Sequence, residues 1–504
     1  MSKKRITIIT LISSVLHMLL LAGFGLIYNQ KILQEYGSSV NGLISTLCQF
    51  VSLFAVLEGG FSTAALVAVY QPIVDGDKSR LNSILLTAKN YLFRLGVIIF
   101  VLSFVLGLVY LFFIHSPLTW MQTISLLLIT VFTTSFSIAF HSKYHVVLNG
   151  FNKQYILNLV SIFTKTLCWI AAVVMILQGR SIVLVYFVYT TNIVLSCILY
   201  RGYVKKKLPD ISYIGDYDKG LIKGTDDVFV QKIASTVFTS TDLVLISVGV
   251  GLANASVYNV YHQIFQMVYA LQSSVSESPF NSFGHLINEK RSKFYEVFYS
   301  YSILIVISTT ILLSAVGSVI VDFIHLYTHG VNDVNYIVPA VALLFYSQYF
   351  FMICNKPFGL LLNLEKKFKE QNFQCVLGAV LNLACSIAGM IVWGIDGIIL
   401  GSVIGAATIM VFNFMKCTRI GHIHKPALIC ALMIVNYIIG LVCIMGRLYI
   451  QELFSGTYAM WILNSVINFL GIGLVVTLID ALIIRKDLRN VWGLLRSFLR
   501  RKPD

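Results

Sequence analysis

Charged residues are scarce in this chain. Asp, Glu, Lys and Arg make up 12% of its 504 residues, whereas soluble proteins average about 25%. Proline is also rare, with 8 residues, while 57% of all residues are hydrophobic. These values exclude a set of soluble domains, a disordered chain, a collagen-like chain and a disulfide scaffold, and they indicate a polytopic membrane protein.

Enzymatic motifs are missing as well. The sequence contains no phosphate-cradling Gly-rich loop with its lysine, so we expect no nucleotide hydrolysis. The pair His422 and His424 has no Cys or acid at a spacing suited to zinc. The segments between helices on the expected outer side are short, which leaves little room for an outer active site. We therefore predict a protein that is not an enzyme and that needs no metal or cofactor.

Long apolar runs dominate the chain. A bilayer core of about 30 Å needs about 20 apolar residues per helix, and we expect fourteen such helices. Two runs exceed one crossing, so we predict bends at Gly59-Gly60 and near Pro357. The predicted spans are 7–28, 40–70, 95–114, 120–140, 155–177, 182–200, 226–249, 256–279, 298–321, 337–363, 373–392, 398–415, 427–446 and 459–484.

The net charge of +15 comes from 37 Lys and Arg against 22 Asp and Glu. Of these cations, 31 fall in eight alternate segments, three fall on the opposite side, and three fall inside predicted helices. Basic residues concentrate in cytosolic loops, so we predict a membrane protein with both termini in the cytosol. Cations dispersed over these segments orient the helices in the membrane, and they do not indicate nucleic-acid binding.

The C-terminal tail, residues 485–504, has an amphipathic pattern. Leu488, Trp492 and Leu495 fall on one helical face, and Arg489 and Arg496 fall on the other. A basic amphipathic helix lies on anionic membrane lipids, so we expect these lipids as partners. A solvated chain end that helps to fix orientation is an equally simple interpretation.

An internal repeat appears at an offset of about 213 residues. The segment around Lys78 aligns with the segment around Arg291, and Asn149 aligns with Asn363. Because six helices separate the two copies, the repeat is parallel, and such repeats place a transport pathway at their interface. We therefore predict an all-α fold of fourteen helices with two pseudo-symmetric six-helix lobes. The expected parts are 1–204 (first lobe), 205–225 (cytosolic loop), 226–416 (second lobe), 417–484 (a helix pair) and the tail 485–504.

Ionisable and polar residues inside predicted helices are candidates for function, because burying a charge in hydrocarbon costs at least about 2.5–3.5 kcal/mol. Polar stripes follow the predicted helices 226–249 and 256–279, and weaker ones follow 7–28 and 40–70. Such stripes indicate a wet cavity or interhelical hydrogen bonds. Amide and aromatic side chains in such a cavity suit sugar hydroxyls, and buried acids and histidines suit ion coupling. The glycan candidates are Asn41, Gln49, Asn259, His262, Gln263, Gln266 and Tyr269, and the candidates for coupling to a proton or sodium gradient are His17, Glu58, Asp242 and Glu277.

Three stretches carry a resemblance to a known family: 35–66, 232–247 and 368–406. The chain resembles the bacterial flippases of lipid-linked oligosaccharides, in the polysaccharide-transporter branch of the multidrug/oligosaccharidyl-lipid/polysaccharide exporter superfamily. The resemblance implies two lobes around a central cavity, a lateral opening for the lipid tail, and cations near the substrate phosphate. Lys165 and Lys232 fit that role by depth, and Lys356 is a further candidate that could instead snorkel to the cytosolic surface. Three acids within the helices, Glu58, Asp242 and Glu277, offset these lysines.

The leading hypothesis is a flippase that moves a polyprenyl-diphosphate-linked oligosaccharide to the outer leaflet by alternating access. Glycosyltransferases and a polymerase of the same pathway are then the expected protein partners. One alternative is a cation-coupled multidrug exporter that uses the buried acids. Another is a membrane scaffold for polysaccharide assembly.

Overall fold

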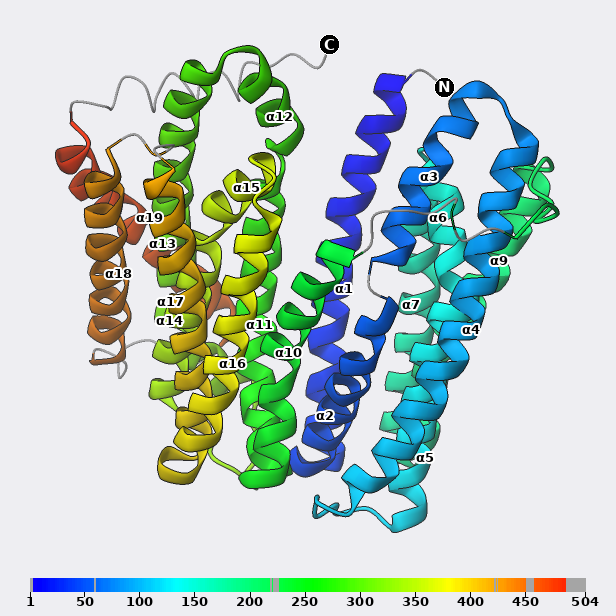
Figure 1. The fold of residues 1–504 in the computed structure, drawn as a ribbon. Helices are drawn as coiled ribbons and strands as arrows, with labels where there is room; N and C mark the ends of the chain where they lie inside the picture. The colour runs from blue at the N-terminus through cyan, green and yellow to red at the C-terminus, as the bar shows by residue number, and fades with distance from the viewer. Residues whose placement is uncertain are drawn as a thin grey trace. The chain divides into compact units, whose positions relative to one another are not determined.

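The computed structural model describes residues 3–58, 60–217, 220, 226–420, 423, 425–449 and 457–485. Within these ranges every regular element is a helix and no strand occurs (Figure 1). The predicted all-α fold is therefore confirmed. The tail prediction lies outside the described residues apart from Arg485, and so do His422 and His424.

Membrane-spanning helices dominate the described part of the chain. Eleven helical segments there are long and apolar enough to cross a bilayer. Three further predicted spans fall outside this set: α10 (Asp226–Gly249), α11 (Leu252–Glu277) and α14 (Pro339–Cys354). α10 and α11 carry the polar stripes seen in the sequence, and α14 has only 16 residues before the chain bends. The count of fourteen crossings stays a prediction.

Contacts divide the chain into two compact units, residues 1–256 and 257–504, so the boundary falls near the start of α11. This grouping joins α10 to the N-terminal helices, and the predicted lobe limits stay predictions. The remaining helices of the first unit are α1 (Lys3–Tyr36), α2 (Ser38–Ala55), the 3-10 turn η1 (Val56–Glu58), α3 (Phe61–Asp75), α4 (Lys78–Leu111), α5 (Trp120–Phe136), the π-helical turn η2 (Ser137–His141), α6 (Ser142–Gly150), α7 (Gln154–Leu177), α8 (Ile182–Thr190) and α9 (Asn192–Lys207).

The second unit is also a helical bundle, and it contains most of α11. Beside α14, its further helices are α12 (Phe280–Glu289), α13 (Arg291–Tyr327), α15 (Lys356–Leu364), α16 (Phe368–Trp393), α17 (Ile395–Arg419), α18 (Pro426–Tyr449) and α19 (Tyr458–Ile483) (Figure 1). Short turns join many helices of both units at the side assigned to the cytosol. Much of the sequence expected there as loops therefore belongs to the ends of helices, and 142–150 forms α6 of the first unit.

Both predicted bends are present. α2 gives way to the single turn η1, and α3 begins at Phe61 after Gly60, whose φ of 83° is left-handed and suits glycine. α14 ends at Cys354, and α15 begins with Lys356 and Pro357. Proline fits a first helical turn because it lacks the N–H that a helix interior requires. Each long apolar run is therefore divided into two helices.

The internal repeat is visible in where the helices begin. α2 begins at Ser38 and α11 at Leu252, 214 residues later. α6 and α15 begin at Ser142 and Lys356, also 214 residues apart, and each has nine residues. The same helix pattern thus occurs twice in the chain, as expected for the two predicted halves.

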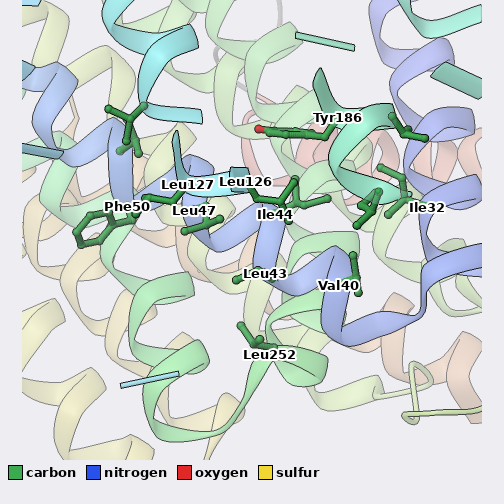
Figure 2. Packing of buried hydrophobic residues seen from close by; sticks show 14 of the residues in the cluster. Ile32, Val40, Leu43, Ile44, Leu47, Phe50, Leu126, Leu127, Tyr186 and Leu252 are labelled. Carbon is green, nitrogen blue, oxygen red and sulfur yellow. The ribbon is translucent and has the colours of Figure 1, made fainter. Parts of the chain in front are cut away.

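The largest apolar cluster of the first unit surrounds α2. Leu43 and Leu47 of α2 are fully buried and pack with Leu126 and Leu127 of α5 (Figure 2). Lipid chains are as apolar as leucine, so close van der Waals packing, more than exclusion of water, stabilises such a cluster in a bilayer. This packing fixes the position of α2 within the first unit.

The second unit contains an unusually close helix pair, α16 and α17. Gly389 and Gly397 face one another so closely that a Cβ on either would collide with the backbone of the other, and Gly401 meets Ser386 in the same way. Small residues let helix backbones approach in membranes. This hairpin coincides with the stretch 368–406 that carries the family resemblance, so part of that resemblance reflects packing.

Candidate functional site

The face that joins α7 to α1 is the most polar interior surface of the first unit. Asn158 of α7 donates hydrogen bonds to Ser13 (3.1 Å) and Ser14 (2.9 Å) of α1, and His17 Nε2 lies 3.0 Å from Ser161 Oγ. Residues three and four apart share a helix face. The helix-1 stripe found in the sequence therefore forms interhelical hydrogen bonds, the structural alternative for such stripes.

Lys165 lies one turn beyond Ser161 on this face of α7. Its side chain is half-buried and interacts electrostatically with His17 of α1 and with His141 of η2. Among the described residues, no carboxylate lies within ion-pair distance of Lys165. We call Lys165, His17 and His141 the Lys165 cluster.

His141 enters this cluster through an irregular helical turn. The π-helical turn Ser137–His141 interrupts the path from α5 to α6, and π turns inside helices are frequent at functional sites. The His141 ring lies 4.7 Å from the His145 ring and 5.1 Å from the Tyr200 ring, measured between centroids. Sequence reasoning missed both histidines because they fell in a segment assigned to a loop.

A second polar stripe of the first unit lies on α10, a helix that the contacts group with this unit. Asp242 is 1% exposed, whereas Lys232 lies near the start of the helix and is exposed. Ser240 of α10 accepts a hydrogen bond from Ser52 of α2 at 3.1 Å. Among the described contacts, none joins Lys232 to Lys165, so the two predicted phosphate ligands are not brought together here.

Two predicted charges of the second unit form a pair. Lys356 Nζ lies 2.8 Å from Glu277 Oε1 and 5.1 Å from the ring centroid of Tyr269. The side chain of Glu277 is 65% exposed and that of Lys356 is 25% exposed. A phosphate ligand and a coupling acid were predicted here, and in this structure the two side chains neutralise each other.

The polar face of α11 in the second unit is lined by aromatic rings of α11 itself and of α14. His262 stacks on Tyr258, with ring centroids 5.5 Å apart, and Tyr349 of α14 donates a hydrogen bond to Gln266 Oε1 at 3.0 Å. His262, Gln263 and Tyr269 are half-buried, Gln266 is exposed and Asn259 is buried. The structure thus brings aromatic rings beside partly accessible amides on this face, and the predicted glycan contacts stay predictions.

Other predicted residues sit in packing positions. Asn41 is 1% exposed; its amide donates to Asn29 Oδ1 at 2.6 Å and accepts from Ser256 at 3.2 Å. Gln49 is half-buried and accepts from Ser52. Glu58 accepts a hydrogen bond from the Ser62 hydroxyl across the bend between η1 and α3. Their functional roles stay predictions.

One buried acid escaped the sequence reading entirely. Asp480 of α19 is 1% exposed, and Asn436 of α18 donates to its Oδ1 at 2.8 Å. It was missed because it lies near the end of a strongly apolar predicted span. The available signal for a buried acid was the aspartate itself, placed close to the end of the otherwise apolar predicted span 459–484.

The fold can now be compared with solved structures. The lipid II flippase MurJ in an inward closed conformation matches with a TM-score of 0.68 at 12% sequence identity, over 95% of this chain and 100% of that chain. A multidrug resistance MATE family transporter of the MOP superfamily matches in its inward-facing conformation with a TM-score of 0.63 at 13% identity, over 82% of this chain and 95% of that chain. No protein-family model and no curated protein matches the sequence.

The chain has the fold of MOP-superfamily transporters. An outward-facing conformation of a MATE family transporter of that superfamily matches as well, with a TM-score of 0.57 at 14% identity, over 84% of this chain and 96% of that chain. These solved structures are transporters and not enzymes. The multi-pass helical architecture predicted from the sequence is thus shared with these solved structures at the level of fold.

Proposed function

We propose that this protein moves a polyprenyl-diphosphate-linked oligosaccharide from the inner to the outer leaflet of the bacterial cytoplasmic membrane by alternating access, for the export of a surface polysaccharide. The observation that carries the proposal is the Lys165 cluster. Lys165 of α7 interacts electrostatically with His17 of α1 and His141 of η2, and no carboxylate of the described residues pairs with the lysine.

A diphosphate is the ligand chemistry that this cluster suits. It carries at least two negative charges, and one lysine within about 4 Å contributes about 4 kcal/mol at an effective dielectric of about 20, before desolvation. An unpaired lysine inside a helix bundle costs free energy to insert, and a bound anion offsets that cost. Lys232 and Lys356 are further proposed phosphate contacts that would act in other steps of the cycle.

The glycan would contact the aromatic and amide face of α11. His262, Gln263, Gln266 and Tyr269 present stacking surfaces and hydrogen-bonding groups in that unit. The fold shared with a lipid II flippase supports a lipid-linked substrate for this chain too. Glycosyltransferases of the same pathway would supply the substrate, and a polymerase would consume it. If neither enzyme copurifies with this protein and neither needs it for activity in cells, that part of the proposal is wrong.

The test is a flipping assay in proteoliposomes. The probe is a fluorescent polyprenyl-diphosphate disaccharide, and the rate is the loss of fluorescence accessible to a membrane-impermeant quencher. Lys165→Ala should lower the rate at least about tenfold, because a charge-assisted contact is worth about 1.5–3 kcal/mol, and Lys165→Arg should retain part of it. Lys293→Ala, an exposed lysine of α13, is the matched control and should flip normally.

Two results would overturn the proposal. Lys165→Ala that is folded and flips the probe at the wild-type rate would remove the anion site. Wild-type protein that flips a polyprenol-linked disaccharide without the diphosphate equally well would remove the substrate class. A scaffold function predicts instead that no variant of the interior changes any rate.

A multidrug exporter is the second candidate, because Asp242 is almost fully buried in α10 and two of the matched structures are multidrug resistance transporters. A buried carboxylate could bind a cationic drug. Drug-efflux assays with Asp242→Asn and Glu58→Gln discriminate between the functions. Loss of drug resistance with normal flipping of the diphosphate probe would favour the exporter.

Coupling to a proton or sodium gradient is a further part of the proposal. His17, Glu58, Asp242 and Glu277 are the groups that could exchange an ion during the cycle. We expect flipping to accelerate when either gradient is imposed across the proteoliposome, and Asp242→Asn to abolish that acceleration. Rates that ignore both gradients would show that the cycle is uncoupled.

A further inference from the structure

A basic pocket lies between the first turns of α16 and the last turns of α17, at the side that the charge pattern assigns to the cytosol. Its volume is about 390 Å³. All of its lining residues belong to the second unit, and none of them belongs to the Lys165 cluster or to the polar face of α11. It is lined by Lys369, Glu370, Phe373, Gln374, Phe412, Met415, Lys416 and Arg419.

The mouth of this pocket is positively charged. Lys369 and Arg419 are exposed, and Lys416 is partly exposed. Glu370 is the single acid of the lining, and its Oε1 lies 3.6 Å from Lys416 Nζ. Three cations against one carboxylate leave a net positive charge, which favours an anion.

The wall below the charges is apolar and faces outward. Phe373 is 65% exposed, Phe412 is 41% exposed and Met415 is 42% exposed. In a helix pair that spans the membrane, such side chains meet lipid acyl chains. The pocket therefore joins a polar head region to an apolar surface over one or two helical turns, which is the profile of a phospholipid at a membrane interface.

Gln374 adds a polar group to the inner wall. It is 5% exposed, its Nε2 donates to the Phe412 carbonyl at 3.5 Å, and its Oε1 has no hydrogen-bond partner among the described residues. A buried acceptor without a partner costs free energy. A donor supplied by a bound headgroup, such as a hydroxyl, would satisfy it after a small side-chain movement.

We propose that this pocket is a specific site for an anionic glycerophospholipid with a hydroxyl-bearing headgroup, of the phosphatidylglycerol type, in the inner leaflet. The phosphodiester binds to three cations, Lys369, Lys416 and Arg419. Gln374 accepts a hydrogen bond from the headgroup hydroxyl. An acyl chain packs on Phe373 and Met415. The ligand is a lipid of the surrounding membrane and is distinct from the transported substrate.

Binding of phosphatidylglycerol to delipidated full-length protein tests the site. The measurements are native mass spectrometry for occupancy and thermal unfolding for stabilisation. Lys369→Gln/Lys416→Gln/Arg419→Gln should weaken binding about 100-fold, given about 1 kcal/mol for each of the three cations near the headgroup. Lys205→Gln/Lys206→Gln/Lys207→Gln is the matched control, since it removes three exposed cations from the last turn of α9, and it should bind like wild type.

Three comparisons separate this site from general attraction of lipid to a basic surface. Equal loss of binding in the two triple variants would overturn the proposal, and so would equal binding of phosphatidylcholine and phosphatidylglycerol. Competition by millimolar inorganic phosphate would show a free-phosphate site and would also overturn it. The unfolding temperature without added lipid verifies that each variant is folded.

Gln374 has its own test. Gln374→Leu should lose affinity for phosphatidylglycerol about fivefold or more and bind phosphatidylmethanol, an anionic phosphodiester without a headgroup hydroxyl, as wild type does. Equal affinity of this variant and wild type for phosphatidylglycerol would exclude the hydroxyl contact. Flipping of the diphosphate probe is measured in parallel: loss of lipid binding with retained flipping shows that the two sites are independent.

Discussion

Arg447 Nη2 of α18 lies 2.7 Å from Asp322 Oδ2 of α13, and only 10% and 12% of the two side chains are exposed. This pair connects α18 to α13 within the second unit, at the side that the charge pattern assigns to the outside. Arg447 is one of three basic residues on that side, so the concentration of basic residues in cytosolic loops does not explain its presence. Its ion pair with Asp322 does explain it.

Removing one member of this pair should destabilise the protein strongly. Arg447→Met leaves a buried carboxylate without its main partner, and breaking a buried pair costs about 3–5 kcal/mol. The measurement is the free energy of unfolding in detergent. The double variant Asp322→Leu/Arg447→Met should recover most of the loss, because an apolar replacement of a buried pair is often neutral. A double variant as unstable as the single one would contradict this account.

The pair of Lys356 and Glu277 should behave differently, because Glu277 is 65% exposed and solvent screens the interaction. Lys356→Ala should change the free energy of unfolding by no more than about 1 kcal/mol. The exchanged variant Lys356→Glu/Glu277→Lys should restore that stability but not flipping, if the lysine also meets the diphosphate. Full flipping by the exchanged variant would limit Lys356 to a structural role.

Gly42 of α2 should not tolerate a side chain. A Cβ at this position would collide with the Leu252 carbonyl and press on the Ser256 backbone at the start of α11. Gly42→Ala should therefore lower the free energy of unfolding by about 1–3 kcal/mol. Gly23→Ala in α1 is the control: no atom lies within 4 Å of the added methyl, and alanine should stabilise the helix slightly. Equal effects at the two sites would refute the close approach.

His141 should contribute to substrate binding through a hydrogen bond. His141→Ala should slow flipping of the diphosphate probe about fivefold, which corresponds to about 1 kcal/mol. Its effect should be smaller in the Lys165→Ala background, because the two residues would share one ligand. His285→Ala, an exposed histidine of α12, is the control. Fully additive effects of His141→Ala and Lys165→Ala would show that they act separately.

Much of the fold follows from local sequence properties. Runs of about 20 apolar residues predicted most helices because a bilayer sets their length. Gly60 and Pro357 predicted the two bends because their backbone restrictions act within a turn. The repeat also appears in the sequence, since the Lys78 and Arg291 segments both fall at the turn where a long helix begins.

The candidate site was only partly predictable. Lys165 stood out because a lone charge in an apolar helix is costly. His141 did not, because a π turn between α5 and α6 determines where its side chain lies, and no residue pattern announced that turn. Glu277 and Lys356 were both recognised, but 79 residues separate them and their pairing depends on how α11 and α15 pack.

The sequence by itself therefore determined the all-helical class and the bends, because each depends on hydropathy or backbone chemistry within a few turns. The orientation expected from the basic residues stays a prediction. Only the tertiary structure decided which polar groups meet: Asn158 with the serines of α1, Lys165 with two histidines, and Asp322 with Arg447. Such contacts join residues far apart in the chain. Their geometry is set by helix packing, which depends on many side chains at once.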